Sequence, residues 1–82
     1  MYPAVIQVTP QDDYRLNVVF ENGEQGELDI KPLLDFGVFQ RIKDYHAFKR
    51  VRVSFDTIAW DCGVDLDPEY VYTKCMVEKV PS

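Results

Sequence analysis

The chain has 82 residues, a length that accommodates one small domain and leaves no room for a second. Its composition, 46% hydrophobic and 28% charged, is that of a globular protein and excludes a disordered chain. The formal net charge of -5 repels phosphate backbones, so direct binding of nucleic acid is not expected. We therefore expect a single domain over residues 1–82.

The first third of the chain is predicted to form strands. Residues 4–8 alternate in the manner of a strand and are followed by turn-forming residues. Apolar and polar side chains alternate over residues 14–20, the clearest pattern in the chain, and again over 26–30. Asn22-Gly23 between them tolerates the positive φ angles of a two-residue type I′ turn. A β-hairpin over residues 14–30 is the result.

Helical spacing replaces this alternation after residue 30. Pro32 suits the first turn of a short helix, and Gly37 suits its C-terminal cap. The apolar residues Val38, Phe39 and Ile42 then keep a helical spacing. We expect them to pack a further turn against the sheet, which would add a second layer to the core.

A second hairpin is predicted in the next segment. Val51, Val53 and Phe55 are expected on its core-facing side, and residues 56–57 turn the chain toward a partner strand at 58–60. The chain is therefore expected to return to the sheet after its helical segment.

The last predicted element is a helix that begins at Asp67-Pro68-Glu69. Here a side-chain acceptor stands at the N-cap, a proline at the first helical position and a carboxylate in the first turn. The helix is predicted to run through Tyr72, and its extent toward Val80 is left open. Strands grouped around helices, without β-α-β alternation, predict an α+β domain. We expect a small, mostly antiparallel sheet of about five short strands in two hairpins, with two or three short helices.

The segment from Trp60 to Tyr70 combines a tryptophan, a glycine and an Asp-Leu-Asp-Pro-Glu run at a specific spacing. With it, several other segments give the chain a pattern that resembles the family called domain of unknown function 2442: Val5 and Val8, Tyr14 to Phe20, Asn22-Gly23-Glu24, Leu28-Asp29-Ile30, Phe39 and Phe48. The resemblance covers nearly the whole chain. It implies a small bacterial α+β protein, found alone or fused to a helix-turn-helix domain, with no established activity.

One turn departs from the family pattern, because Asp61-Cys62-Gly63 stands where a Pro-Asn-Gly-like sequence is expected. This departure weakens any role that the resemblance assigns to the turn. No helix-turn-helix segment follows in this sequence, so we expect no DNA-binding role to transfer from the fused relatives.

No catalytic motif is visible, and no catalytic residue is assigned. His46 is the only histidine, and a lone histidine between two predicted elements is usually solvated. A general base would need a nucleophile and an orienting group, yet Ser54, Ser82, Cys62 and Cys75 stand in no nucleophilic motif. The cysteines and His46 also lack the paired spacing of a zinc site. We expect no enzyme activity, no metal and no cofactor.

The densest group of carboxylates comprises Asp61, Asp65, Asp67 and Glu69. Clustered oxygens can bind a hard cation or serve as general acids and bases. Helix capping by Asp67 and a favourable helix-dipole contact of Glu69 explain the same order by local physics, and this reading is preferred. No glycine-rich phosphate loop is present.

Basic residues are segregated from this acidic stretch. Five of the nine lysines and arginines fall in one segment, opposed only by Asp44: Arg41, Lys43, Lys49, Arg50 and Arg52. A positive stripe on an otherwise acidic protein can orient a partner and speed encounter. The alternative is a solvated strand face neutralised by nearby carboxylates, which is at least equally favoured because surface pairs contribute little energy.

The main hypothesis is a non-enzymatic protein-interaction or regulatory accessory module that docks on another protein. Its candidate contact residues are Arg41, Arg50, Arg52, Trp60, Asp65 and Tyr70. The alternative is a small-ligand-binding domain or enzyme with a pocket near Trp60, Asp65 and Tyr70. A weaker hypothesis places the basic stripe on nucleic acid, against the net charge. A homodimer through an exposed strand edge is also possible.

The sequence also indicates where the protein resides. The first seven residues carry neither the basic nor the apolar region of a secretory signal, and no apolar run is long enough to cross a bilayer. Cys62 and Cys75 are too few for the disulfide framework of a secreted miniprotein. We expect a cytoplasmic protein that binds no membrane and keeps both thiols reduced.

Overall fold

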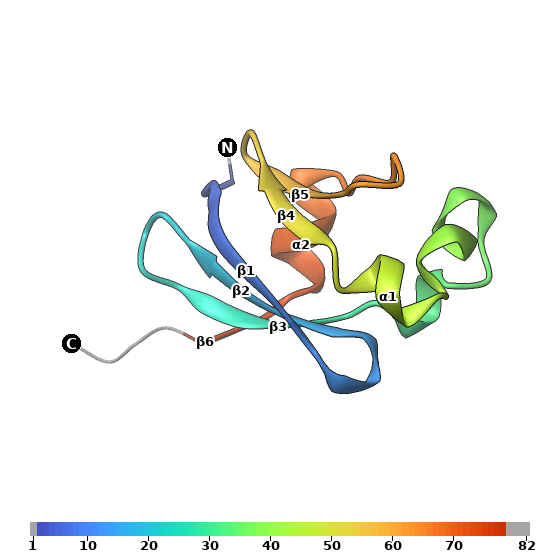
Figure 1. Ribbon diagram of the computed structural model, residues 1–82. Coiled ribbons are helices and arrows are strands. Elements are labelled where there is room, and N and C mark those ends of the chain that lie inside the picture. The colour runs from blue at the N-terminus through green and yellow to red at the C-terminus, as the bar shows by residue number, and fades with distance from the viewer. Residues whose placement is uncertain (1, 79–82) are drawn as a thin grey trace.

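The computed structural model describes residues 2–78 and has the α+β architecture expected from the sequence (Figure 1). Its elements, in chain order, are β1 (Val5–Gln11), the 3-10 helix η1 (Asp12–Tyr14), β2 (Arg15–Phe20), β3 (Gln25–Asp29), the 3-10 helices η2 (Lys31–Leu33) and η3 (Gly37–Ile42), α1 (Tyr45–Phe48), β4 (Val51–Ser54), β5 (Thr57–Trp60), α2 (Pro68–Lys74) and β6 (Met76–Glu78).

The strands form two antiparallel sheets. The larger has the order β1-β2-β3-β6, and the smaller is the β4–β5 hairpin. The predicted hairpin over 14–30 is confirmed, since β2 and β3 pair with Leu16 opposite Leu28. The alternation in β2 places Leu16, Val18 and Phe20 in the core at 1% exposure or less. The same period that identified the strand therefore determines which of its faces is buried.

The turn of this first hairpin differs from the prediction. A type I′ turn needs positive φ at both central residues, but of Asn22 and Gly23 only Gly23 has it, at +89°. The turn extends over residues 21–24, and the Phe20 N–H donates to the Glu24 carbonyl at 2.8 Å. The Asn22 Oδ1 accepts from the Glu24 backbone N–H at 3.1 Å, which stabilises this longer turn instead.

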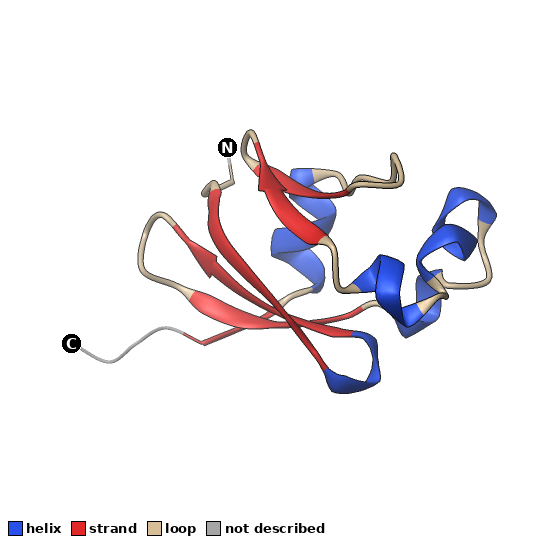
Figure 2. Ribbon diagram, in the orientation of Figure 1, coloured by secondary structure: helices blue, strands red, loops and turns tan. Residues whose placement is uncertain are grey.

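The helical segment over residues 31–48 gathers at one end of the molecule (Figure 2). Pro32 lies in the first turn of η2, as predicted, but η2 ends at Leu33, and Gly37 begins η3 with a φ of +47° instead of capping a helix. Ile42 is fully buried, whereas Val38 is 49% exposed, so the expectation that Val38 packs on the sheet is wrong. A 3-10 helix with three residues per turn cannot keep the predicted spacing on one face.

The β4–β5 hairpin and α2 lie together over one face of the larger sheet (Figure 1). The core between these layers includes Phe20 and Leu28 from the sheet, Ile58 and Trp60 from β5, and Val71 from α2. This arrangement gives the chain one continuous core, in which β5 is buried on both sides.

The second predicted hairpin is confirmed, with one correction at its turn. Ser54 pairs with Thr57, so Phe55 and Asp56 form the turn. Phe55 is 97% exposed and does not share the core-facing side of Val51 and Val53. The alternation ended one residue earlier than its sequence pattern indicated, because the turn takes the backbone out of the strand at Phe55.

The C-terminal helix begins as predicted. The Asp67 Oδ1 accepts the Glu69 backbone N–H at 2.8 Å, and Pro68 occupies the first turn. Helix α2 ends at Lys74, and the following strand β6 pairs with β3, an element that sequence reasoning missed. The sequence left open whether this helix extends toward Val80. Positions from residue 79 on lie outside the described residues.

Candidate functional site

Three of the predicted contact residues come from different parts of the fold and meet at the turn over residues 61–63. Arg41, in η3, donates from Nη1 to the Cys62 carbonyl at 3.2 Å. Arg52, in β4, places its Nε 3.1 Å from the Asp61 Oδ1. Arg50, between α1 and β4, lines a depression that also contains Asp61 and Cys62. We call Arg41, Arg50 and Arg52 the arginine surface.

The turn at the centre of the arginine surface is fixed by the backbone. The Trp60 N–H donates to the Val64 carbonyl at 2.7 Å, and the Gly63 N–H donates to the Trp60 carbonyl at 3.0 Å. Gly63 has a φ of +93°, a conformation that residues with a Cβ rarely adopt. The conformation of the turn therefore depends on these hydrogen bonds and on Gly63, the glycine that remains although the Pro-Asn-Gly-like sequence expected of the family is absent.

The depression beside Arg50 has a volume of about 390 Å³ and is lined by Asp44, His46, Ala47, Arg50, Asp61 and Cys62. The Asp44 side chain caps α1 by accepting the His46 backbone N–H at 3.1 Å. Capping accounts for the positions of Asp44 and His46 beside this depression. The charged groups around the depression are exposed, so water and salt screen them.

The ion pair within the arginine surface is loosely held. The side chains of Arg52 and Asp61 are 58% and 53% exposed, and exposed pairs of this kind contribute about 0–1 kcal/mol to stability. Such a pair can be exchanged at low cost for a carboxylate of a binding partner. The structure therefore keeps the arginines close together without neutralising them in a buried network.

Two further basic residues flank the arginine surface in the sequence but have local partners. Lys43 Nζ lies 2.9 Å from the Asp35 Oδ1, and this hydrogen bond and charge raise the pKa of Lys43. Lys49 Nζ lies 5.6 Å from the centre of the Tyr45 ring, within cation–π range. The five basic residues of the predicted stripe therefore do not act as one group. Only its three arginines lie at the turn over residues 61–63, whereas Lys43 and Lys49 contact other residues.

The remaining predicted contact residues do not join this group. Trp60 is 1% exposed, and its indole N–H donates to the Phe48 carbonyl at 2.9 Å, so its side chain belongs to the core. Asp65 is exposed and its backbone pairs with Ala59. Tyr70 is half-buried on α2 and packs against the core. The hypothesis of a pocket formed by Trp60, Asp65 and Tyr70 loses its central aromatic residue.

The start of α2 accounts for two of the four residues in the carboxylate cluster, while Asp61 pairs with Arg52 and Asp65 is exposed. Asp67 caps α2, and Glu69 lies in its first turn. Within the described residues, no group of three or more His, Cys, Asp or Glu side chains is placed to hold a metal ion. The positions of these carboxylates are therefore explained without a bound cation.

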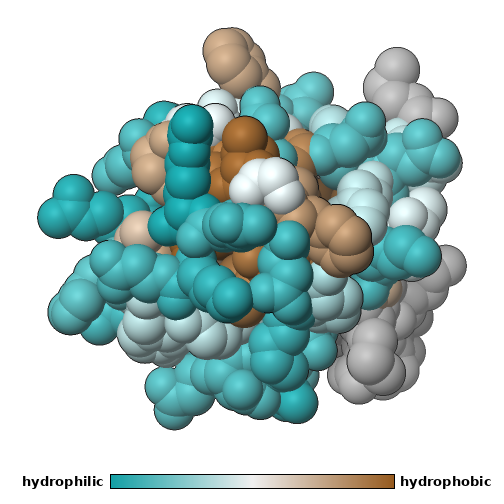
Figure 3. Space-filling model, turned by 90° about the vertical axis from the view of Figure 1, so that its right-hand side faces the viewer, coloured by the Kyte–Doolittle hydropathy of each residue, from teal (hydrophilic) through white to brown (hydrophobic). Residues whose placement is uncertain are grey.

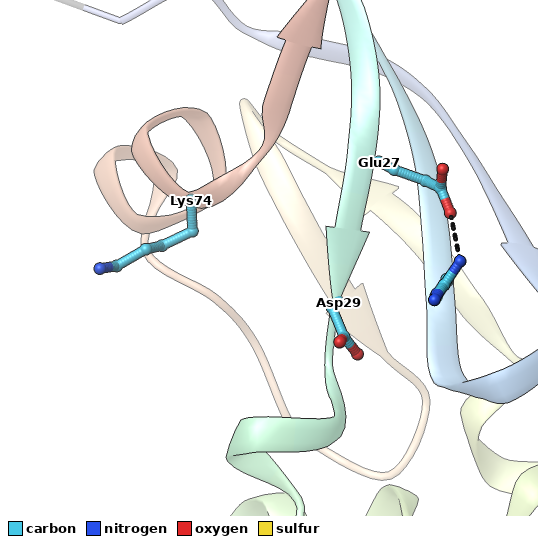
Figure 4. A pocket seen from close by; sticks show the side chains of 4 residues that line it. Glu27, Asp29 and Lys74 are labelled. Carbon is cyan, nitrogen blue, oxygen red and sulfur yellow. Dashed lines mark hydrogen bonds and ion pairs between the residues drawn. The ribbon is translucent and has the colours of Figure 1, made fainter.

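Another depression lies between β2, β3 and the end of α2, with a volume of about 260 Å³ (Figure 4). Arg15 Nη1 lies 3.4 Å from the Glu27 Oε1, and both side chains are about half exposed. Asp29 also lines the depression, but the Lys74 side chain extends away from both carboxylates. The charged groups therefore do not converge on a shared point where a ligand could be held.

The two cysteines have different surroundings. Burial, with a smaller contribution from the charge of Glu27, raises the pKa of the Cys75 thiol to about 11. At neutral pH this thiol stays protonated and unreactive. Cys62 is half-buried at the arginine surface, where its backbone carbonyl is already bonded to Arg41.

Sequence reasoning missed the exposed apolar residues near the arginine surface. Phe36 is 65% exposed and Val38 is 49% exposed, and both lie at the start of η3. Val38 and Arg41 are three residues apart in a 3-10 helix, so their side chains lie on the same face. Viewed from this end of the molecule, apolar side chains gather at the centre and hydrophilic ones surround them (Figure 3).

Comparison with known proteins places the chain in a family. Residues 5–76 match the family described as "Protein of unknown function (DUF2442)", and this match covers most of the chain, which therefore belongs to that family. No curated protein and no solved structure matches the chain. Among the described residues, no helix has both the length and the apolar character required to cross a membrane.

Proposed function

We propose that this member of the DUF2442 family is a non-enzymatic protein-interaction module that docks on an acidic partner protein through the arginine surface. The observation that carries the proposal is the meeting of Arg41, Arg50 and Arg52 at the turn over residues 61–63. Arg50 and Arg52 are two residues apart in the chain, and folding brings Arg41 of η3 and the turn over residues 61–63 beside them. A basic surface on a chain of net charge -5 selects partners by electrostatic complementarity.

Apolar residues beside the arginines complete the proposed contact. Phe36 and Val38 are exposed on the same end of the molecule as Arg41. Protein interfaces combine an apolar centre with a polar rim in which arginine is enriched. The partner is therefore expected to present carboxylates around an apolar patch.

A protein fits this surface better than nucleic acid does. Asp44 and Asp61 line the same depression as Arg50, so a phosphate backbone that approaches it meets two carboxylates. A protein partner can place a basic group or a hydrogen-bond donor against these carboxylates, whereas a nucleic acid backbone cannot.

The buried position of Cys75 and the capping role of Asp44 and Asp67 support a non-enzymatic role. Each of these groups has a structural explanation that leaves it unavailable for catalysis. The functional residues of the module are then those that contact the partner.

Affinity purification from a lysate of the protein's own source, followed by mass spectrometry, tests the proposal. The test variant carries Arg41→Glu, Arg50→Glu and Arg52→Glu. The control carries Arg15→Glu, Lys31→Glu and Lys74→Glu, which gives the same net charge at positions outside the arginine surface. Circular dichroism confirms that both variants are folded.

A stoichiometric acidic protein retained by wild type and by the control, and lost by the test variant, supports the proposal. The affinity of the purified pair is expected to fall as salt is raised, because exposed charges are screened within about 10 Å at 0.1 M. Equal losses in both variants would attribute binding to net charge alone. Retention by the test variant would overturn the proposal.

A further inference from the structure

The tip of the β4–β5 hairpin carries an aromatic residue in a backbone conformation that aromatic residues rarely adopt. Phe55 has a φ of +54°. The other turn residue, Asp56, does not have a positive φ. Positive φ at only the first central residue is the pattern of a type II′ turn, in which that position normally holds glycine. A bulky side chain at positive φ is a genuine outlier.

The fold makes no use of the Phe55 side chain. It is 97% exposed, the most exposed of the large apolar residues described in the structure. Both its backbone conformation and its exposure to water are therefore unfavourable for the isolated protein. Strained residues of this kind cluster at functional positions such as active sites, ligand clamps and switch regions.

The surroundings of the tip are acidic. The Val5 backbone N–H donates to the Asp56 carbonyl at 3.1 Å, and the Glu21 N–H donates to the Ala4 carbonyl at 2.8 Å, so the start of β1 ties these residues together. The side chains of Asp56 and Glu21 are exposed, and Ile6 beside Val5 is 59% exposed. The tip thus presents the exposed Phe55 next to the exposed Asp56, and the start of β1 connects it through backbone hydrogen bonds to the exposed Glu21.

We propose that Phe55 is an anchor residue that inserts into an apolar pocket with a basic rim on a partner protein. The carboxylates flanking the tip select this occupant by charge complementarity. They also disfavour an anionic lipid surface and a second copy of the same tip, because both would bring like charges together. This contact is separate from the arginine surface and has the opposite polarity.

Pairing of two copies through β1 is also disfavoured. Strand β1 is an edge of the larger sheet, but its register is interrupted by a bulge between Val5 and Gln7, and Pro10 removes a backbone donor. A phenylalanine supplies about 200 Å² of contact area, whereas a stable interface needs about 800 Å² from each partner. Phe55 therefore acts as one anchor within a larger heterologous interface.

Site-specific photo-crosslinking in cells of the protein's own source tests this proposal. The full-length chain carries p-benzoylphenylalanine in place of Phe55, and a matched chain carries it in place of Phe36, which is 65% exposed at the arginine end. Mass spectrometry identifies the captured protein and the crosslinked peptide. We expect one protein captured from position 55, through a peptide that lines an apolar pocket with lysine or arginine at its rim.

The captured protein is then purified and titrated by calorimetry against wild type and Phe55→Gly. We expect at least a tenfold weaker affinity for Phe55→Gly, the loss typical of a truncated anchor, with no decrease in melting temperature. Crosslinks only to a second copy of this chain, only to lipid, or to nothing at all would overturn the proposal, as would equal affinities. The triple arginine variant retains Phe55, so its failure to bind concerns the arginine surface alone.

Discussion

Replacing Phe55 with glycine is expected to make the protein more stable. With 97% of the residue exposed, removing the side chain loses about 0.1–0.2 kcal/mol of apolar burial. Relief of the positive φ of +54° gains about 1–2 kcal/mol. The greater freedom of glycine in the unfolded chain costs about 0.5–1 kcal/mol. At the midpoints of these ranges the net gain is about 0.6 kcal/mol, or a rise in melting temperature of about 2–5 °C for a domain of this size.

Thermal and urea denaturation of Phe55→Gly and Phe55→Ala measure this gain. Alanine removes the aromatic ring but keeps the Cβ, so it retains the backbone strain and is expected to remain within about 0.5 kcal/mol of wild type. The difference between the two variants isolates the cost of the positive φ. If Phe55→Gly is no more stable than Phe55→Ala, the backbone at this position is not strained. A large loss in Phe55→Ala would mean that the ring is packed.

Four further outcomes are expected. Trp60→Phe should lower the free energy of unfolding by about 2–4 kcal/mol, because it creates a cavity and leaves the buried Phe48 carbonyl without its indole donor. Urea denaturation followed by circular dichroism measures this loss. Asp67→Ala should cost about 1 kcal/mol through loss of the α2 cap while Asp67→Asn costs less, and equal losses in the two variants would contradict capping. A thiol reagent at about pH 8 should modify Cys62 in the folded protein and Cys75 only after unfolding. The pKa of Cys75 is raised from 9.0 to about 11, so its protonated form stabilises the fold below pH 9. This contribution to stability is lost as the pH rises toward 11. An unchanged free energy of unfolding in urea between pH 9 and pH 11 would contradict the raised pKa.

The features that could be read from the sequence are those controlled by neighbours in the chain. The alternation of Leu16, Val18 and Phe20 identified β2 and its buried face, because side chains two residues apart share one side of a strand. Asp67 was identified as a helix cap because its side chain bonds a backbone N–H two residues away. Neither feature depends on distant parts of the fold.

The failures have equally specific causes. Phe55 continued the alternation of Val51 and Val53, and only the pairing of Ser54 with Thr57 shows that it lies in the turn. Strand β6 has three residues, too few for a period, and its pairing with β3 joins segments about fifty residues apart. Trp60 was predicted as a contact residue and as the aromatic member of a possible pocket, and only tertiary packing shows that its side chain lies in the core.

The sequence by itself determined the α+β class, the two hairpins, the capped helix and the segregation of basic residues into one segment, because each depends on local spacing or composition. Tertiary structure alone decided that Arg41, Arg50 and Arg52 share one turn, that Trp60 is buried, and that Phe55 stands exposed at a strained tip. Those facts depend on how elements distant in the sequence pack around the core, a long-range outcome that no local pattern encodes.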